Sequence, residues 1–379
     1  MIHLFLFIAI NFGLFELQGF SVRTVGLVGL IVVCCFKIKS NYFYFINAFL
    51  FSIFLILYSY LYISNEIRFT STFLLHTRNL IVLFVFFGML YKSNLDFAGF
   101  LHALSLFIVS CAFINLLIIA FYKQPWVVIA EYTGTNEEFF AHLYHRLILP
   151  FGTPNQLGFV AGLLILYNFS LKNVKICLLL FIPLMGAASN SSLIPLTLIF
   201  LFYFLYKMMN QKRFVIKRNN ILTLGIISCI SFIAFLVFFD GTSPGGVGGR
   251  SAENMNESIG RHLFLRLNTL EAISQFPLPQ FFYGVGFGNS HQYIGGTYSF
   301  TIPLTTLFES GVFGLYFYYI LPFLFVLKFR NIKWVSFIIF YVFIASLLYQ
   351  LNSDISFYIL PLIIAYQLQR NSNENNLSL

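Results

Sequence analysis

Charged residues are scarce in this sequence. Only 9% of its 379 residues are Asp, Glu, Lys or Arg, whereas 59% are hydrophobic. Soluble globular domains carry roughly 25% charged residues, so the composition excludes an ordinary soluble domain. Apolar runs about as long as a bilayer is thick recur along the chain, which is typical of a membrane protein with many spans. The formal net charge of +9 therefore belongs to loops on two sides of a membrane, and each side must be considered separately. For this reason nucleic acid is not an expected partner.

Patterns that bind metals or form disulfides are also missing. No Asp-x-Asp pair or His–carboxylate cluster suited to a divalent ion lies in a segment predicted to face outward, so no metal or cofactor is expected. The first apolar run lacks the basic start and small-residue cleavage site of a signal peptide, so we expect a membrane helix there. The cysteines lie inside apolar runs without metal-site spacing, which favours packing roles. They are Cys34, Cys35, Cys111, Cys177 and Cys229.

Apolar stretches bounded by polar residues predict an all-α polytopic membrane protein, a single integral membrane domain over residues 1–379 with about twelve transmembrane helices. Two segments between spans, 122–154 and 240–300, are long enough to form a site, and the other connections are short. The spans are predicted near 2–20, 23–36, 42–63, 70–91, 97–121, 155–170, 174–189, 191–209, 221–239, 301–327, 334–350 and 355–367.

Lysine and arginine are divided unequally between the two predicted faces. With a cytoplasmic N-terminus, ten of the eleven lysines but only four of the eleven arginines lie on the inner side. Cytoplasmic loops carry an excess of positive charge, so this orientation makes 122–154 and 240–300 large outer loops. Arginine binds phosphate through a planar fork that lysine lacks, so arginines on the outer face predict recognition of an anion. The alternative is pairing with loop carboxylates, namely Glu131, Glu137, Glu253 or Glu257.

The first large loop contains a cluster of residues suited to proton transfer. Glu138 and His142 are four residues apart, so on a helix they share a face, and His145 and Arg146 follow directly. A carboxylate beside an imidazole can make a general base near neutral pH. The alternative is an amphipathic interfacial helix whose polar side faces water. After this cluster, Gly152 breaks the helix pattern and Asn155 is a possible cap for the next span.

The second large loop contains two further arginines and a glycine-rich turn. A helix is predicted from about residue 257 to 275, on which Arg261 and Arg266 diverge by about 140°. The spacing of Gly284, Gly286 and Gly288 differs from a dinucleotide-binding fingerprint. These glycines permit a tight turn whose backbone N–H groups cradle an anion or pack close to a helix.

The order of these features resembles the O-antigen polymerase and ligase family, which are multi-span membrane proteins with two arginine-bearing outer loops. The resemblance covers roughly residues 140–325, and it depends on the ordered combination of three segments. These are "RLILPFGTPNQLG" (146–158), "RLNTLEAISQFPLPQFFYGVGFG" (266–288) and "LTTLFESGVFGL" (304–315).

The resemblance implies the fold of a C-type membrane glycosyltransferase in the bacterial inner membrane. It implies a polymerase that joins polyprenyl-diphosphate-linked oligosaccharide repeat units at the periplasmic face, with membrane lipids and a chain-length regulator as partners. Arg146, Arg266 and Arg261 are then the candidate diphosphate ligands. His142, His145, Glu138 and Glu309 are the candidate groups for proton transfer.

Two departures from the family pattern bear on the type of enzyme. Ser189 is followed by Asn190, where family members often have arginine, and Phe300 and Thr301 stand where ligases have a His-Asn pair. The missing histidine favours a polymerase over an O-antigen ligase. A lipid-linked glycan flippase is the alternative from another class. A flippase needs charged residues along its spans, and only Glu16, His76, Arg78, His102 and Glu309 are clear candidates.

The predicted orientation can be tested by labelling. Cysteines placed at Gly134 and Ser251 should react with a membrane-impermeant thiol reagent added to whole cells, because both positions lie in predicted outer loops. A cysteine at Asn210 should react only after the cells are opened. External labelling at Asn210 would invert the orientation and remove the argument from lysine and arginine.

Overall fold

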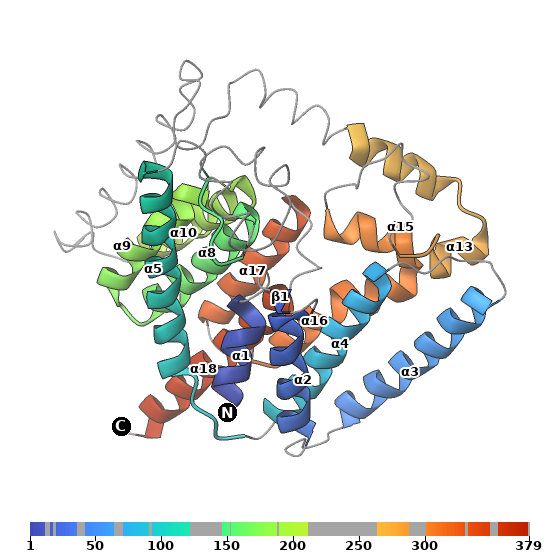
Figure 1. Ribbon diagram of the computed structural model, residues 1–379, viewed down its shortest axis with the longest axis horizontal. Helices are drawn as coiled ribbons and strands as arrows, with labels where there is room; N and C mark the ends of the chain where they lie inside the picture. The colour runs from blue at the N-terminus through green and yellow to red at the C-terminus, as the bar shows by residue number, and fades with distance from the viewer. Residues whose placement is uncertain are drawn as a thin grey trace.

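The structure is a computed structural model, and it is a bundle of helices of very different lengths (Figure 1). The start of α1 (Ile2–Asn11) and the end of α18 (Ile355–Leu377) lie toward the same end of the bundle in Figure 1. The predicted span at 221–239 lies outside the described residues. The described residues are 1–11, 16–17, 20–35, 42–63, 71–90, 93–121, 146–151, 153–187, 189–210, 264–287, 301–329, 333–348 and 355–377.

Four helical segments in this part of the chain are long and apolar enough to cross a membrane. They are Tyr44–Tyr62, Phe73–Leu90, Ala98–Phe121 and Ile302–Leu327. Shorter apolar helices accompany them, so the architecture supports an all-helical, multi-pass membrane protein. The count of twelve spans stays a prediction.

The first apolar run differs from its prediction. Instead of one span over 2–20, α1 ends at Asn11 and a minimal β-hairpin follows, in which β1 (Glu16–Leu17) pairs antiparallel with β2 (Phe20–Ser21). The Asn11 side chain donates to the carbonyl of Phe7 at 2.9 Å, and the polar and glycine residues after it interrupt the apolar run. α2 (Val22–Cys35) then returns alongside α1.

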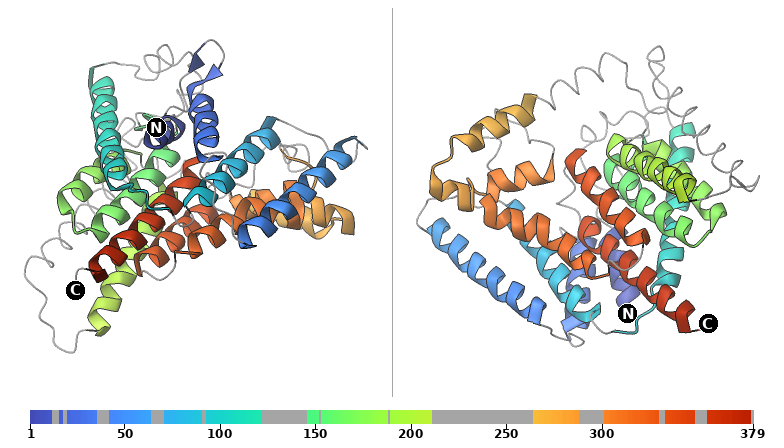
Figure 2. Two further views of the ribbon diagram at one scale, coloured as in Figure 1. Left: turned by 90° about the horizontal axis from the view of Figure 1, so that it is seen from below. Right: turned by 180° about the vertical axis from the view of Figure 1, so that it is seen from behind.

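The next three helices run at or close to their predicted positions. They are α3 (Tyr42–Ile63), α4 (Ser71–Leu90) and α5 (Ala98–Phe121). α3 and α5 lie at opposite edges of the bundle in both views of Figure 2, whereas α4 lies inside it. Most of α4 is buried, and one of its rings, Phe87, stacks on Phe325 with centroids 4.1 Å apart.

A second group of helices begins after the first large loop. α8 (Pro154–Ser170) packs against α9 (Val174–Ala187) and α10 (Asn190–Asn210). The cap of α8 is Thr153 rather than Asn155, because the N–H of Gln156 donates to the Thr153 hydroxyl at 3.4 Å. Pro154 explains the shift: proline is favoured in the first turn, and it holds the preceding residue extended.

The last helices contain the centre of the bundle. α15 (Ile302–Leu315), the π-helix η1 (Tyr316–Ile320) and α16 (Leu321–Leu327) follow one another along a single span. α17 (Lys333–Leu348) comes next, and then α18, whose residues 355–368 are all buried. α18 packs against α4, α8, α16 and α17. Its Gln367 accepts from the N–H of Phe97 at 2.7 Å, which connects α18 to the start of α5.

Candidate functional site

The span Ile302–Leu327 contains a break in its backbone. Gly311 has φ 63° and ψ −165°, values that no α-helix adopts. Such a residue interrupts the i to i−4 hydrogen bonds and leaves the carbonyls before it without their helical donors. Inside a membrane these carbonyls need partners from the protein, because lipid offers none.

The glycine-rich turn supplies those partners. The N–H groups of Val285 and Gly286 donate to the carbonyls of Phe308 and Glu309, at 3.1 and 2.8 Å. From α3, the hydroxyl of Tyr58 also donates to the Glu309 carbonyl, at 3.2 Å. Three segments far apart in the sequence therefore meet at the break in α15.

Two glycines make this close approach possible. Gly284 and Gly311 both have positive φ, of 74° and 63°. A Cβ on Gly284 would overlap the backbone of Glu309, and a Cβ on Gly311 would overlap the backbone of Phe282. Of the two roles predicted for the turn, packing against a helix is therefore the one that its geometry supports. The N–H of Gly286 bonds to α15, the N–H of Gly284 bonds to Gln280, and Gly288 lies outside the described residues.

Glu309 is a buried carboxyl group inside this span. Only 2% of the residue is exposed, and the break at Gly311 follows two residues later. Placing an ionisable group within a membrane span costs free energy, so such residues are more often functional than incidental. The hydroxyl of Thr306, one turn earlier, is buried without a hydrogen-bond partner among the described residues. The sequence prediction named Glu309 but not Thr306, although the threonine pair at 305–306 lies one turn before Glu309 in the sequence.

Arg266 lies on the helix that packs against the same break. Residues 264–274 are helical, and Leu265 from this helix joins Val285 and Phe308 in one buried apolar cluster. Leu265 and Phe308, which precede Arg266 and Glu309 in the sequence, thus belong to the same apolar cluster. Burial lowers the pKa of the half-buried Arg266 guanidinium, which still stays charged at neutral pH. Its Nε is buried without a hydrogen-bond partner among the described residues.

Arg146 lies at a different junction, between α5 and α9. Its Nε and one terminal nitrogen both donate to the carbonyl of Ala187, at 2.8 and 2.6 Å. This carbonyl belongs to the last turn of α9, where a positive charge interacts favourably with the helix dipole. The following N–H groups of Ile148 and Leu149 both donate to Oδ1 of Asn115 on α5. Arg146 is therefore held firmly at the end of α9.

Asn155 takes part in a polar cluster at the start of α10. The hydroxyl of Ser189 donates to Asn155 Oδ1 at 2.7 Å and is 2.8 Å from the hydroxyl of Ser191. Ser192 donates to Ser189 at 3.4 Å. The cluster begins two residues after Ala187, the residue that binds Arg146. Arg146 and Asn155 thus both lie at the α9–α10 connection, whereas Arg266 lies on a helix that packs beside α15.

Several predicted site residues can be placed neither at the break in α15 nor at the α9–α10 connection, because they lie outside the described residues. Within the described part of the chain, no three His, Cys, Asp or Glu side chains are grouped so that they could hold a metal ion. The site residues that lie outside the described residues are Glu138, His142, His145, Gly152, Arg261 and Gly288.

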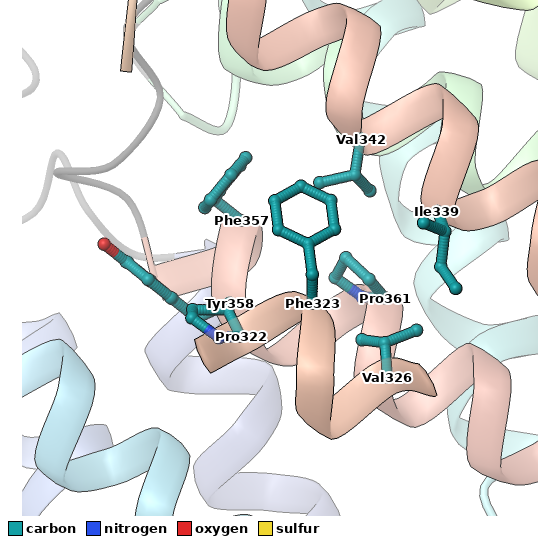
Figure 3. A pocket seen from close by; sticks show the side chains of 8 residues that line it. All are labelled: Pro322, Phe323, Val326, Ile339, Val342, Phe357, Tyr358 and Pro361. Atoms are coloured by element: carbon teal, nitrogen blue, oxygen red, sulfur yellow. The ribbon is translucent and has the colours of Figure 1, made fainter. Parts of the chain in front are cut away.

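A small apolar pocket lies elsewhere, between α16, α17 and α18 (Figure 3). The only side-chain polar atom among its lining residues is the hydroxyl of Tyr358, which donates to the carbonyl of Tyr318 at 3.2 Å. In Figure 3 this hydroxyl points away from the pocket. The pocket therefore offers no group for catalysis. Its lining residues are Pro322, Phe323, Val326, Ile339, Val342, Phe357, Tyr358 and Pro361.

Comparisons with known proteins add no relative: no family model matches the chain, and neither a curated protein nor a solved structure is significantly similar to it. Arguments about function therefore depend on the residues and contacts described above.

The interlocked glycines can be tested by substitution. Gly284→Ala and Gly311→Ala should each lower the free energy of unfolding by about 1–3 kcal/mol or more, because a side chain at positive φ is strained and here also overlaps backbone. Gly99→Ala is the matched control, since a Cβ there meets nothing within 4 Å. Thermal unfolding in detergent micelles measures the difference. Equal midpoints for all three variants would contradict the interlock.

Proposed function

We propose that this chain is a polysaccharide polymerase of the outer face of the bacterial cytoplasmic membrane. It joins oligosaccharide repeat units carried on polyprenyl diphosphate into O-antigen or a related surface polysaccharide. The observation that carries the proposal is the junction at the break in α15. There the buried carboxyl group of Glu309 follows Phe308, which packs against Leu265 on the helix of the half-buried Arg266.

The reaction requires two kinds of help from the protein. The acceptor sugar hydroxyl loses its proton to a base, and its oxygen attacks the anomeric carbon of the donor. The bond from that carbon to the diphosphate breaks, and polyprenyl diphosphate leaves with the electron pair. Arginine stabilises the negative charge on the leaving group, and a histidine or carboxylate accepts the proton.

The two described arginines differ in what supports such a role. Two nitrogens of Arg146 already bind the Ala187 carbonyl, so in this arrangement the residue also anchors the first loop. Arg266 has a buried Nε for which the described residues provide no acceptor, and a phosphate oxygen would satisfy it. Arg266 is therefore the primary diphosphate ligand in this proposal, with Arg146 and Arg261 as additional ones.

The arginine roles lead to a substitution test. Arg266→Lys and Arg146→Lys should remove most of the polymerising activity while protein level is kept, because lysine keeps the charge but loses the planar fork. Arg250→Lys, in the Gly/Ser-rich stretch of the second loop, should be tolerated. Chain length of the surface polysaccharide is measured alongside thermal stability. Normal-length polymer from both Arg146→Lys and Arg266→Lys would show that these side chains do not bind the anion.

The base is assigned by a second set of variants. We expect the His142/His145 pair to accept the proton, with Glu138 orienting His142, because both histidines lie next to Arg146 in the sequence. His142→Ala, His145→Ala, Glu138→Gln and Glu309→Gln are compared on purified lipid-linked repeat units. If both histidine variants polymerise at the natural rate and Glu309→Gln is inactive, the base is Glu309.

The surface glycan of a deletion strain separates this proposal from its alternatives. Loss of a polymerase leaves a single repeat unit attached, whereas loss of a ligase leaves none. Loss of a flippase traps repeat units inside the cell. Only the first result supports the proposal.

A further inference from the structure

The helical segment 264–274 and the short helix α13 (Leu278–Tyr283) expose large apolar side chains. Phe264 is 61% exposed, and Leu267 and Leu270 follow at intervals of three residues, so these three lie along one side of the helix. On α13, Leu278 is 72% exposed. The exposed apolar residues of the two helices, here called the apolar face, are Phe264, Leu267, Leu270, Leu278, Phe281 and Phe282.

The opposite side of residues 264–274 is already used. Leu265 is buried with Val285 and Phe308, and Ala272 and Ile273 pack against that cluster. The apolar face is therefore additional to the side that holds the helix on α15. In an aqueous loop a surface of this kind would be costly, because contiguous exposed apolar patches are rare on proteins surrounded by water.

The apolar face continues into the surface of a span. Phe282 of α13 contacts Phe313 of α15, with ring centroids 5.6 Å apart. Phe313 belongs to the candidate span Ile302–Leu327 and is itself 41% exposed. An exposed phenylalanine in a membrane span faces lipid, so the ring of Phe282 beside it lies at a depth that lipid reaches. Since α13 packs directly on α15, the whole short helix shares this position.

Polar residues separate the two parts of the apolar face. Glu271, Ser274 and Gln275 are exposed in the last turn of the helical segment, between its apolar first turns and α13. A helix with apolar residues on one part of its exposed side and polar residues on another is typical of the boundary between hydrocarbon and headgroups.

We infer that residues 264–283 form an interfacial hairpin which binds bilayer lipid through the apolar face. Its partner is the hydrocarbon of the membrane, with Glu271, Ser274 and Gln275 at headgroup level. The sequence prediction placed this segment in an aqueous outer loop at 240–300. The inference is independent of the reaction catalysed, because it concerns only the depth of these residues.

Tryptophan fluorescence measures that depth in the full-length chain. Trp126 and Trp334 are replaced by phenylalanine, and single tryptophans are introduced as Leu267→Trp, Phe281→Trp or Ser274→Trp. The proteins are reconstituted into phosphatidylcholine vesicles with or without bromine on the acyl chains. Brominated lipid should reduce the fluorescence of the Leu267→Trp and Phe281→Trp proteins strongly. The Ser274→Trp protein, the matched control on the same exposed side, should be quenched more by acrylamide in the water.

Two results would overturn the inference. Strong acrylamide quenching of the Leu267→Trp and Phe281→Trp proteins without an effect of bromine would mean that the apolar face lies in water. Protection from both quenchers would mean that another protein, or a second copy of this chain, covers it. If the background without Trp126 and Trp334 fails to fold, the same tryptophans are introduced into the natural chain and the bromine effect is measured as a difference from it.

Discussion

Every backbone polar group inside a membrane must find a partner within the protein, and this constraint organises the region around α15. The break at Gly311 leaves carbonyls that the helix itself cannot satisfy. They are bonded instead by the turn at 284–287 and by Tyr58 from α3. The break therefore joins the second large loop, an outer helix and a span at one point. Glu309 contributes both the carbonyl that receives two of these bonds and a buried carboxyl group.

Arg146 and Arg266 differ in the partners of their guanidinium groups. Arg146 is bound to the end of α9, close to the serine cluster at the start of α10. Arg266 is carried by a helix that packs on the broken span, and its Nε lacks a protein partner in the described part of the chain. Arg146 is thus satisfied by a backbone carbonyl, whereas the Nε of Arg266 has no acceptor among the described residues.

The ranges of α3, α4 and α5 followed from apolar runs because each of these long runs forms one helix. The first run was misjudged because its total hydrophobicity hid the interruption after Asn11. The cap of α8 was missed because Pro154 favours Thr153 over Asn155. The partner of the glycine turn could not be predicted at all: Val285 and Gly286 bond to residues more than twenty positions later in the chain. The surroundings of Arg146, Arg266 and Glu309 depend on the same kind of long-range contact, which sequence spacing does not contain.

The position of α18 has a consequence for how the protein is made. Residues 355–368 of this helix are buried, and α4, α8, α16 and α17 all pack against it. All of these helices precede α18 in the chain, so the ribosome releases them into the membrane before the element that fills the space between them exists. The earlier helices must therefore remain loosely associated during synthesis. Closure of the bundle around α18 therefore comes after all of these helices have been inserted.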